Sequence, residues 1–121
     1  GKDVEYKGLV SDEELSDLLL NAEIILFVSF YEGFGLPVLD SFSLGVPVIG
    51  AKTAVNEELF KDKLYYIKTD SCEELADKIV EVLAISKTHT IVENLKNFSK
   101  KFNWQKTAKE TLDFYNISLK K

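Results

Sequence analysis

Two carboxylates and two glycines lie close together in one short stretch, and their spacing suits ligand binding. Glu32 and Asp40 are eight residues apart, and Gly33 and Gly35 follow the first of them. A glycine has no Cβ, so the backbone there can approach a ligand closely. Each carboxylate can accept hydroxyl hydrogens, and the vicinal diols of a sugar or a ribose are natural donors to such a pair. The stretch therefore predicts a site for a sugar-bearing ligand.

The elements on either side are expected to position this stretch. Residues 24–28 (IILFV) are all apolar, which is typical of a strand covered on both faces. Pro37 suits the first turn of a helix, and Gly45 suits its end. The loop over residues 29–35 then lies at the carboxyl end of a strand, where ligands bind in open α/β sheets. The free amides at the helix start favour a phosphate there.

Strand-like and helix-like segments alternate along the rest of the chain. Besides residues 24–28, the strand-like segments are residues 4–10, 46–50 and 64–68. Helical patterns separate them, which indicates βαβ units and a mainly parallel sheet. We therefore expect an α/β fold in one domain over residues 1–121.

Polar residues at the expected helix starts predict where the helices begin. Ser11 and Ser71 each stand three residues before a glutamate, as in a capping box, and Asn103 is expected to cap the last helix. Leu15, Leu18, Leu19 and Ala22 are predicted to form the buried stripe of the first helix. The last helix is expected to carry an apolar stripe that needs a covering surface, formed by Trp104, Leu112, Tyr115 and Leu119. Its aromatic residues are expected in a core or an interface, namely Trp104, Phe114 and Tyr115.

The composition excludes several functional classes. The chain has 121 residues and a net charge of −5, which argues against a general nucleic-acid binder. Its single cysteine, Cys72, and single histidine, His89, exclude an internal disulfide and a His/Cys zinc cluster. We expect Cys72 to be a partly buried small residue and His89 to be solvated. No stretch is long and apolar enough to span a bilayer. The first residues also lack a basic segment followed by an apolar one, so we do not expect secretion.

Charge is distributed unevenly, and all 15 basic residues are lysines. Residues 1–93 contain 8 lysines and 18 acids (8 − 18 = −10), whereas residues 94–121 contain 7 lysines and 2 acids (7 − 2 = +5). The basic tail is interpreted as a solvated helix face, with an anionic membrane surface or an acidic partner as the alternatives. There is also no Asp-x-Asp pair of the kind that clamps a divalent ion on a nucleotide diphosphate.

The central stretch resembles a known signature. Residues 31–40 (YEGFGLPVLD), followed by residues 45–49 (GVPVI), closely resemble the donor-binding signature of retaining GT-B glycosyltransferases of the glycosyltransferase 4 type, also called glycosyl transferases group 1. Residues 8–15 (GLVSDEEL) resemble the turn and helix that precede it in that family. Residues 56–57 (NE) and 102–104 (FNW) resemble its downstream landmarks, so the resemblance covers nearly the whole chain.

The resemblance implies a role for each residue of the signature. Glu32 would be the catalytic residue that contacts the transferred sugar, and Asp40 would contact the ribose hydroxyls. The sugar and diphosphate would meet backbone amides around Gly33, Phe34, Gly35 and Leu36. Leu9 and Val10 lie where the base-binding loop of the family runs. The family works without a bound metal, which agrees with the missing Asp-x-Asp, and needs no cofactor beyond a donor such as a UDP- or GDP-sugar.

Two departures from the family bear on the prediction. The family usually has glutamate where Asp40 stands, and aspartate is shorter by one carbon–carbon bond, roughly 1.5 Å. The family's C-terminal domain also begins with further βα units, which supply an arginine and a lysine to the diphosphate. We therefore expect a truncated Rossmann-like domain, a parallel sheet flanked by helices, over residues 1–121. Its helix over 104–121 would cross to a missing N-terminal domain, and the surfaces left exposed predict self-association.

The function predicted by the resemblance is donor binding in a retaining glycosyltransferase. Such an enzyme would move a hexose or N-acetylhexosamine from a nucleotide sugar to a glycan or polyprenyl-linked acceptor in bacterial surface polysaccharide synthesis. We expect a cytoplasmic protein with peripheral membrane contact, no nucleic-acid partner, and no activity in the isolated chain. The alternative is a non-catalytic α/β binding or scaffolding domain. Length alone also fits a receiver-type signalling domain, but that class needs an aspartate where the apolar strand ends, at Ser29.

Overall fold

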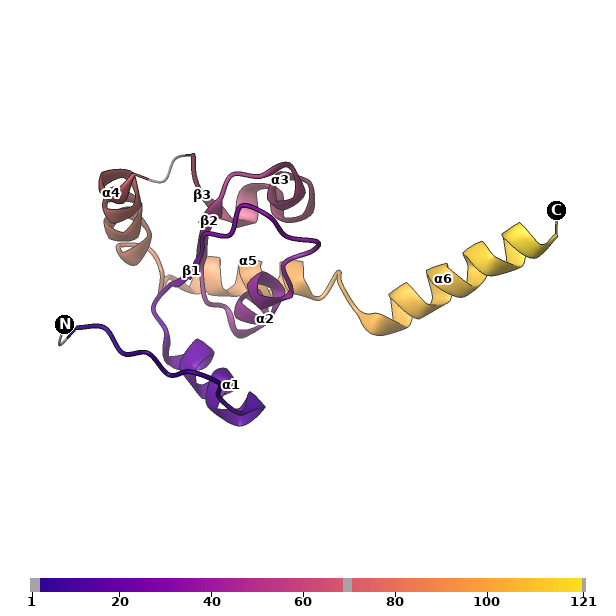
Figure 1. The fold of residues 1–121 in the computed structure, drawn as a ribbon, viewed down its shortest axis with the longest axis horizontal. Helices are drawn as coiled ribbons and strands as arrows, with labels where there is room; N and C mark the ends of the chain where they lie inside the picture. Colours follow the sequence, from indigo (N-terminus) through magenta and orange to yellow (C-terminus); the bar gives the residue numbers. More distant parts are fainter. Residues whose placement is uncertain (1–2, 69–70, 121) are drawn as a thin grey trace.

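A three-stranded parallel sheet forms the centre of the computed structural model, which describes residues 3–68 and 71–120 (Figure 1). The strands are β1 (Ile25–Phe27), β2 (Val48–Ala51) and β3 (Tyr65–Ile67), in the order β1-β2-β3. Leu26 pairs with Ile49, which in turn pairs with Tyr65 on the other side. The parallel α/β fold predicted from the sequence is therefore confirmed.

Helices connect the strands and some of them cover the sheet, and they begin close to where the sequence predicts. They are α1 (Asp12–Asn21), α2 (Leu36–Leu44), α3 (Ala54–Phe60), α4 (Cys72–Leu83), α5 (His89–Ser99) and α6 (Trp104–Leu119), with a short 3-10 helix η1 (Lys61–Lys63) before β3. The hydroxyls of Ser11 and Ser71 accept the N–H of Glu14 and Glu74, each at 3.2 Å. The Asn103 Oδ1 accepts the Lys106 N–H at 2.8 Å. The predicted caps are confirmed.

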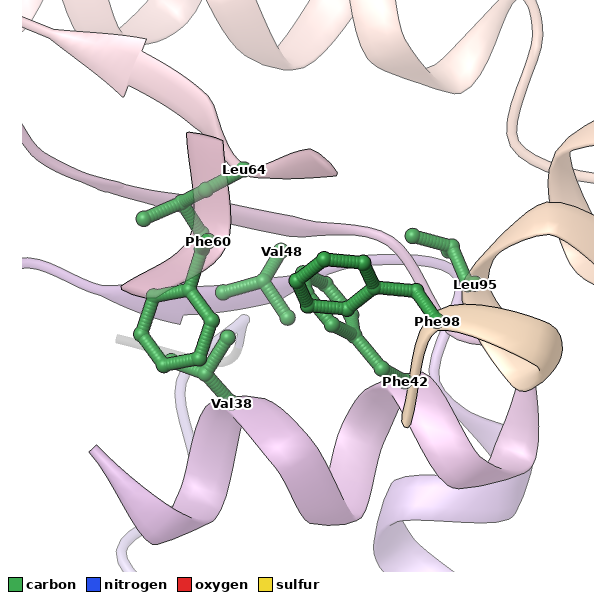
Figure 2. Packing of buried hydrophobic residues seen from close by; sticks show 7 residues of the cluster. All are labelled: Val38, Phe42, Val48, Phe60, Leu64, Leu95 and Phe98. Carbon is green, nitrogen blue, oxygen red and sulfur yellow. The ribbon is translucent and has the colours of Figure 1, made fainter. Parts of the chain in front are cut away.

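The core lies on both faces of β2, whose four residues are all buried. On one face, Val48 packs with residues of α2, α3 and α5 and with Leu64, which lies just before β3. Figure 2 shows the members of this cluster, namely Val38, Phe42, Phe60, Leu64, Leu95 and Phe98. On the other face, Ile49 packs with Ile67 and with Val82 of α4. Successive strand residues point to opposite faces, so Val48 and Ile49 serve the two clusters in turn.

The outer strand β1 departs from the prediction of a strand covered on both faces. Ile25 and Phe27 pack against the α2–α5 cluster, but Leu26, on the opposite face, is 47% exposed. In the described residues, α4 covers this face of the sheet over β2 and β3, where it packs with Ile49, Tyr65 and Ile67, and it does not extend over Leu26. β1 lies at the outer edge of the sheet, so its apolar run is only half covered.

Three further expectations about burial and pairing are wrong. Residues 4–10 form no strand and are not part of the sheet of β1, β2 and β3. Leu9 in this segment is fully exposed. The apolar stripe of α1 is not buried: α1 contacts α2 but buries none of its residues. Cys72 is exposed because it is the first residue of α4. His89 is exposed, as predicted.

Candidate functional site

The glycine-containing loop lies where the sequence predicts, between the carboxyl end of β1 and the start of α2. Gly35 immediately precedes α2 in the left-handed conformation, with φ of 88°. A Cβ on Gly35 would lie 3.2 Å from Phe60 Cε2 and 3.6 Å from Phe27 Cε1. Both the backbone angle and the close aromatic rings therefore require glycine at this position.

The start of α2 is open to an anion. Gly35 caps the helix without a side-chain hydrogen bond, and the first turn contains no acidic residue. Pro37 occupies that turn and has no N–H, while the Val38 N–H donates to the Gly35 carbonyl at 3.0 Å. Among the described residues, no side chain makes a capping hydrogen bond at the positive end of this helix dipole, and the dipole favours a phosphate there.

Aromatic contacts attach this loop to the core. The ring of Phe34 meets the ring of Phe102 edge to face, with centroids 5.9 Å apart. The ring centroids of Phe102 and Phe98 are 5.5 Å apart, and those of Phe98 and the buried Phe42 are 6.0 Å apart. Aromatic pairs at such separations stabilise beyond their buried area. The loop is therefore connected through these four rings to the face of α2 that packs on β2.

A groove of about 860 Å³ lies between α2 and the junction of α5 with α6. Its apolar lining comes from both sides: Phe34, Leu36 and Leu39 from the loop and α2, and Phe102 and Trp104 from the junction. Its charged lining includes Asp40 on the α2 side and Lys100, Lys101 and Lys106 on the junction side. Apolar walls with a few convergent polar groups are the usual form of a small-molecule site.

The structure brings together some of the predicted site residues and leaves others apart. Phe34, Leu36 and Asp40 line the groove. Glu32 and Gly33 lie exposed on the loop outside the groove lining, and Gly35 is buried and does not line the groove either. Leu9 and Val10 belong to the N-terminal segment before α1 and do not line the groove.

Sequence reasoning missed the lysines of the groove. Lys100, Lys101 and Lys106 are exposed, as the interpretation of the basic tail as a solvated face implies, but the sequence does not show that they line a groove together with Asp40. Trp104, expected in a core or an interface, is 75% exposed and lines the groove as well. The available signal was the overlap of the basic tail with the landmark at residues 102–104, but no local pattern places that segment beside α2.

The downstream landmark at residues 56–57 has a structural role in α3. The fully buried Asn56 donates from Nδ2 to the Ala51 carbonyl at 2.8 Å, which joins the end of β2 to α3. The Tyr66 hydroxyl donates to the Asn56 carbonyl at 3.0 Å. Burial, with the negative charges of Glu57 and then Asp62, raises the pKa of Tyr66 to about 12. Glu57 is a half-exposed partner of Lys52 in an ion pair at 3.1 Å.

The described part of the chain has neither a cluster of metal-binding side chains nor a membrane-spanning helix. Within residues 3–68 and 71–120, no three His, Cys, Asp or Glu side chains come together as a possible metal site. In the same residues, no helix has both the length and the apolar character to cross a membrane.

Comparison with known proteins identifies the family. The model of the family "Glycosyl transferases group 1" matches residues 1–102, and the chain belongs to this family. The signature at residues 31–40 lies within that match. The small parallel α/β fold agrees with a glycosyltransferase domain of Rossmann type.

Individual relatives include an O-antigen chain mannosyltransferase B of Escherichia coli, 29% identical over 116 residues, which are 94% of this chain and 30% of the relative. An uncharacterized glycosyltransferase of Methanocaldococcus jannaschii is 27% identical over 122 residues, 96% of this chain and 31% of the relative. A serotype-specific mannosyltransferase of Escherichia coli is 29% identical over 105 residues, 87% of this chain and 12% of the relative. The chain thus spans less than a third of the length of each.

Proposed function

We propose that this chain is the donor-binding part of a retaining GT-B glycosyltransferase. The observation that carries the proposal is the signature loop, which stands between β1 and an uncapped helix start with Asp40 at an adjoining groove. The donor would be a nucleotide sugar such as a UDP- or GDP-hexose or -N-acetylhexosamine. The acceptor would be a glycan or polyprenyl-linked chain in bacterial surface polysaccharide synthesis. Two of the relatives bear the names of mannosyltransferases, one of them of the O-antigen chain, which supports a hexose and this setting.

In this proposal each part of the loop acts on a different part of the donor. Glu32, exposed on the loop, holds hydroxyls of the transferred sugar near the reacting carbon. Asp40 accepts the ribose hydroxyls. The amides around Gly33 and Leu36, with the positive end of the α2 dipole, stabilise the charge that develops on the leaving diphosphate. The chemistry proposed by the family resemblance needs no bound metal and retains the configuration of the sugar.

The rest of the proposed enzyme lies outside this chain. Acceptor-binding groups would come from an N-terminal domain, and α6 would cross toward it with its exposed apolar residues, among them Leu112 and Tyr115. The isolated chain would then transfer no sugar and would self-associate through these surfaces. We place the complete enzyme in the cytoplasm, with peripheral contact to the membrane that carries its acceptor.

The test is the substitution Glu32→Gln in the complete protein. It should lower turnover with its nucleotide-sugar donor by about a hundredfold or more, because a charge-assisted hydrogen bond near the reacting centre is lost. The thermal unfolding midpoint should stay the same, since Glu32 is an exposed loop residue. Glu58→Gln, an exposed carboxylate on α3, is the matched control and should keep full activity. A Glu32→Gln protein with most of its kcat/KM would contradict the assignment.

A further inference from the structure

The groove beside Asp40 has a cationic side that the family signature does not include. Seven of the 15 lysines of the chain fall in residues 94–121 with only two acids. Three of these lysines, at positions 100, 101 and 106, line the groove on the side opposite α2. Asp40 and Glu110 are the acids of the same lining, so three lysines stand against two carboxylates and the groove carries a net positive charge in a chain that is otherwise acidic.

Two of these ammonium groups are only weakly neutralised. Lys106 Nζ lies 3.9 Å from Glu110 Oε1, which is at the limit of an ion pair. Lys101 Nζ lies 5.2 Å from the centroid of the Phe98 ring, and among the ion pairs of residues 3–68 and 71–120 it takes part in none. Its charge also acts on Asp62, whose pKa is lowered mainly by the hydrogen bond from Lys63 and only slightly by the charge of Lys101. Both can therefore turn to an anion in the groove without breaking a strong contact.

The remaining lining fits the other parts of a nucleotide. Asp40 provides a carboxylate for hydroxyls, and the exposed ring of Trp104 provides a flat apolar surface for a base or a sugar. The volume of about 860 Å³ is within the range of small-molecule sites, roughly 300–1,000 Å³. Hydroxyl acceptor, aromatic surface and cations occur together in this groove.

We propose that Lys101 and Lys106 bind the phosphates of a nucleoside diphosphate in this groove, across from Asp40. This inference rests on the proposed function and deepens it, since it names phosphate-binding residues outside the signature. Because the chain contains no arginine, lysines are its only side chains with a permanent positive charge at neutral pH. The phosphates would lie between these lysines and the open start of α2, where the dipole adds to the attraction.

The experiment is calorimetric titration of the complete protein with GDP and with UDP, each beside its nucleoside. The double variant Lys101→Gln/Lys106→Gln should bind the preferred diphosphate about tenfold more weakly, while nucleoside binding stays the same. Arginine at both positions should restore the affinity. The matched control is Lys109→Gln, an exposed lysine of α6 outside the groove, which should change affinity by less than about twofold.

Each other outcome overturns the proposal. If the double variant binds the diphosphate as tightly as the unsubstituted protein, the lysines do not bind its phosphates, but the proposed function is not contradicted. An equal loss for nucleoside and diphosphate would mean that the lysines shape the groove instead of binding phosphate. Loss of binding to phosphatidylglycerol vesicles with diphosphate affinity intact would assign the lysines to a membrane surface. If the unsubstituted protein binds neither diphosphate, the proposed function fails as well.

Discussion

The helices α2 and α6 are both amphipathic, but only one of them has a surface to cover its apolar side. The nine residues of α2 bury Val38, Ser41 and Phe42, because α2 lies between β2 and α5. The sixteen residues of α6 bury none, and Figure 1 shows this helix extending away from the sheet. An apolar stripe indicates which face of a helix can be buried, but whether that face is buried depends on the elements that lie beside it.

The same difference separates the two parts of the candidate site. The loop with Gly35 is joined to the buried core through Phe34 and Phe102, so its geometry is determined by packing. The lysine side of the groove stands at the junction leading into α6, where the surroundings are exposed. A binding site made of one packed side and one open side can adjust to its ligand from the open side.

The largest expected effect compares a buried with an exposed aromatic ring. Phe42→Ala should lower the free energy of unfolding by about 3–5 kcal/mol, because it leaves a cavity among Val38, Phe60 and Phe98. The matched substitution Tyr115→Ala, on the exposed side of α6, should change it by less than about 0.5 kcal/mol in the isolated chain at a concentration low enough to keep it monomeric, where the surface proposed for self-association is uncovered. Chemical denaturation measures both. Similar losses for the two would mean that α6 is covered in solution.

The second prediction compares the effect on stability of replacing two glycines of the same loop. Gly35→Ala should destabilise the fold by about 1–2 kcal/mol, because alanine is strained at a φ of 88° and its Cβ presses on Phe60. Gly33→Ala should leave stability unchanged, since a Cβ there meets no atom within 4 Å. If a donor approaches the backbone at Gly33, the same variant should weaken donor binding. Thermal unfolding and donor titration distinguish the two roles, and equal destabilisation would contradict the assignment.

The third effect concerns Tyr66, whose pKa is raised to about 12 mainly by burial. The unfolded chain, with a tyrosine pKa near 10, loses this proton first as the pH rises. The contribution of Tyr66 to stability is therefore complete below pH 10 and is lost between about pH 10 and 12.

Tyrosine absorbance followed against pH should show one group that titrates near pH 12 and is absent from Tyr66→Phe. The phenylalanine variant should also lose about 1 kcal/mol of stability at neutral pH, because the hydrogen bond to Asn56 is gone. Ordinary titration of every tyrosine, with native stability constant up to pH 11, would contradict this prediction.

The smallest expected effect is that of Asp40→Glu. The side chain lines an open groove and has room to lengthen, so stability should not change measurably. Donor affinity should stay the same or improve, because the longer side chain restores the reach that the family usually has. Calorimetry with the nucleotide sugar measures it. A large loss of affinity in a folded variant would assign Asp40 to packing or to the helix start.

The local features of this protein were determined by the sequence itself. Ser11, Ser71 and Asn103 each bond to an N–H three residues away, so the starts of α1, α4 and α6 depend on neighbours in the chain. The strand at residues 25–27 and the loop before α2 likewise followed from short patterns, and so did the family signature.

Burial and the second side of the groove were decided only by the tertiary structure. The apolar stripes of α1 and α6 carry the same pattern as those of covered helices, yet no other element buries them. Lys101 and Asp40 lie about sixty positions apart in the chain, and they line one groove because α5 packs against α2. Contacts between such distant segments depend on the packing of whole elements, which no local spacing of residues records.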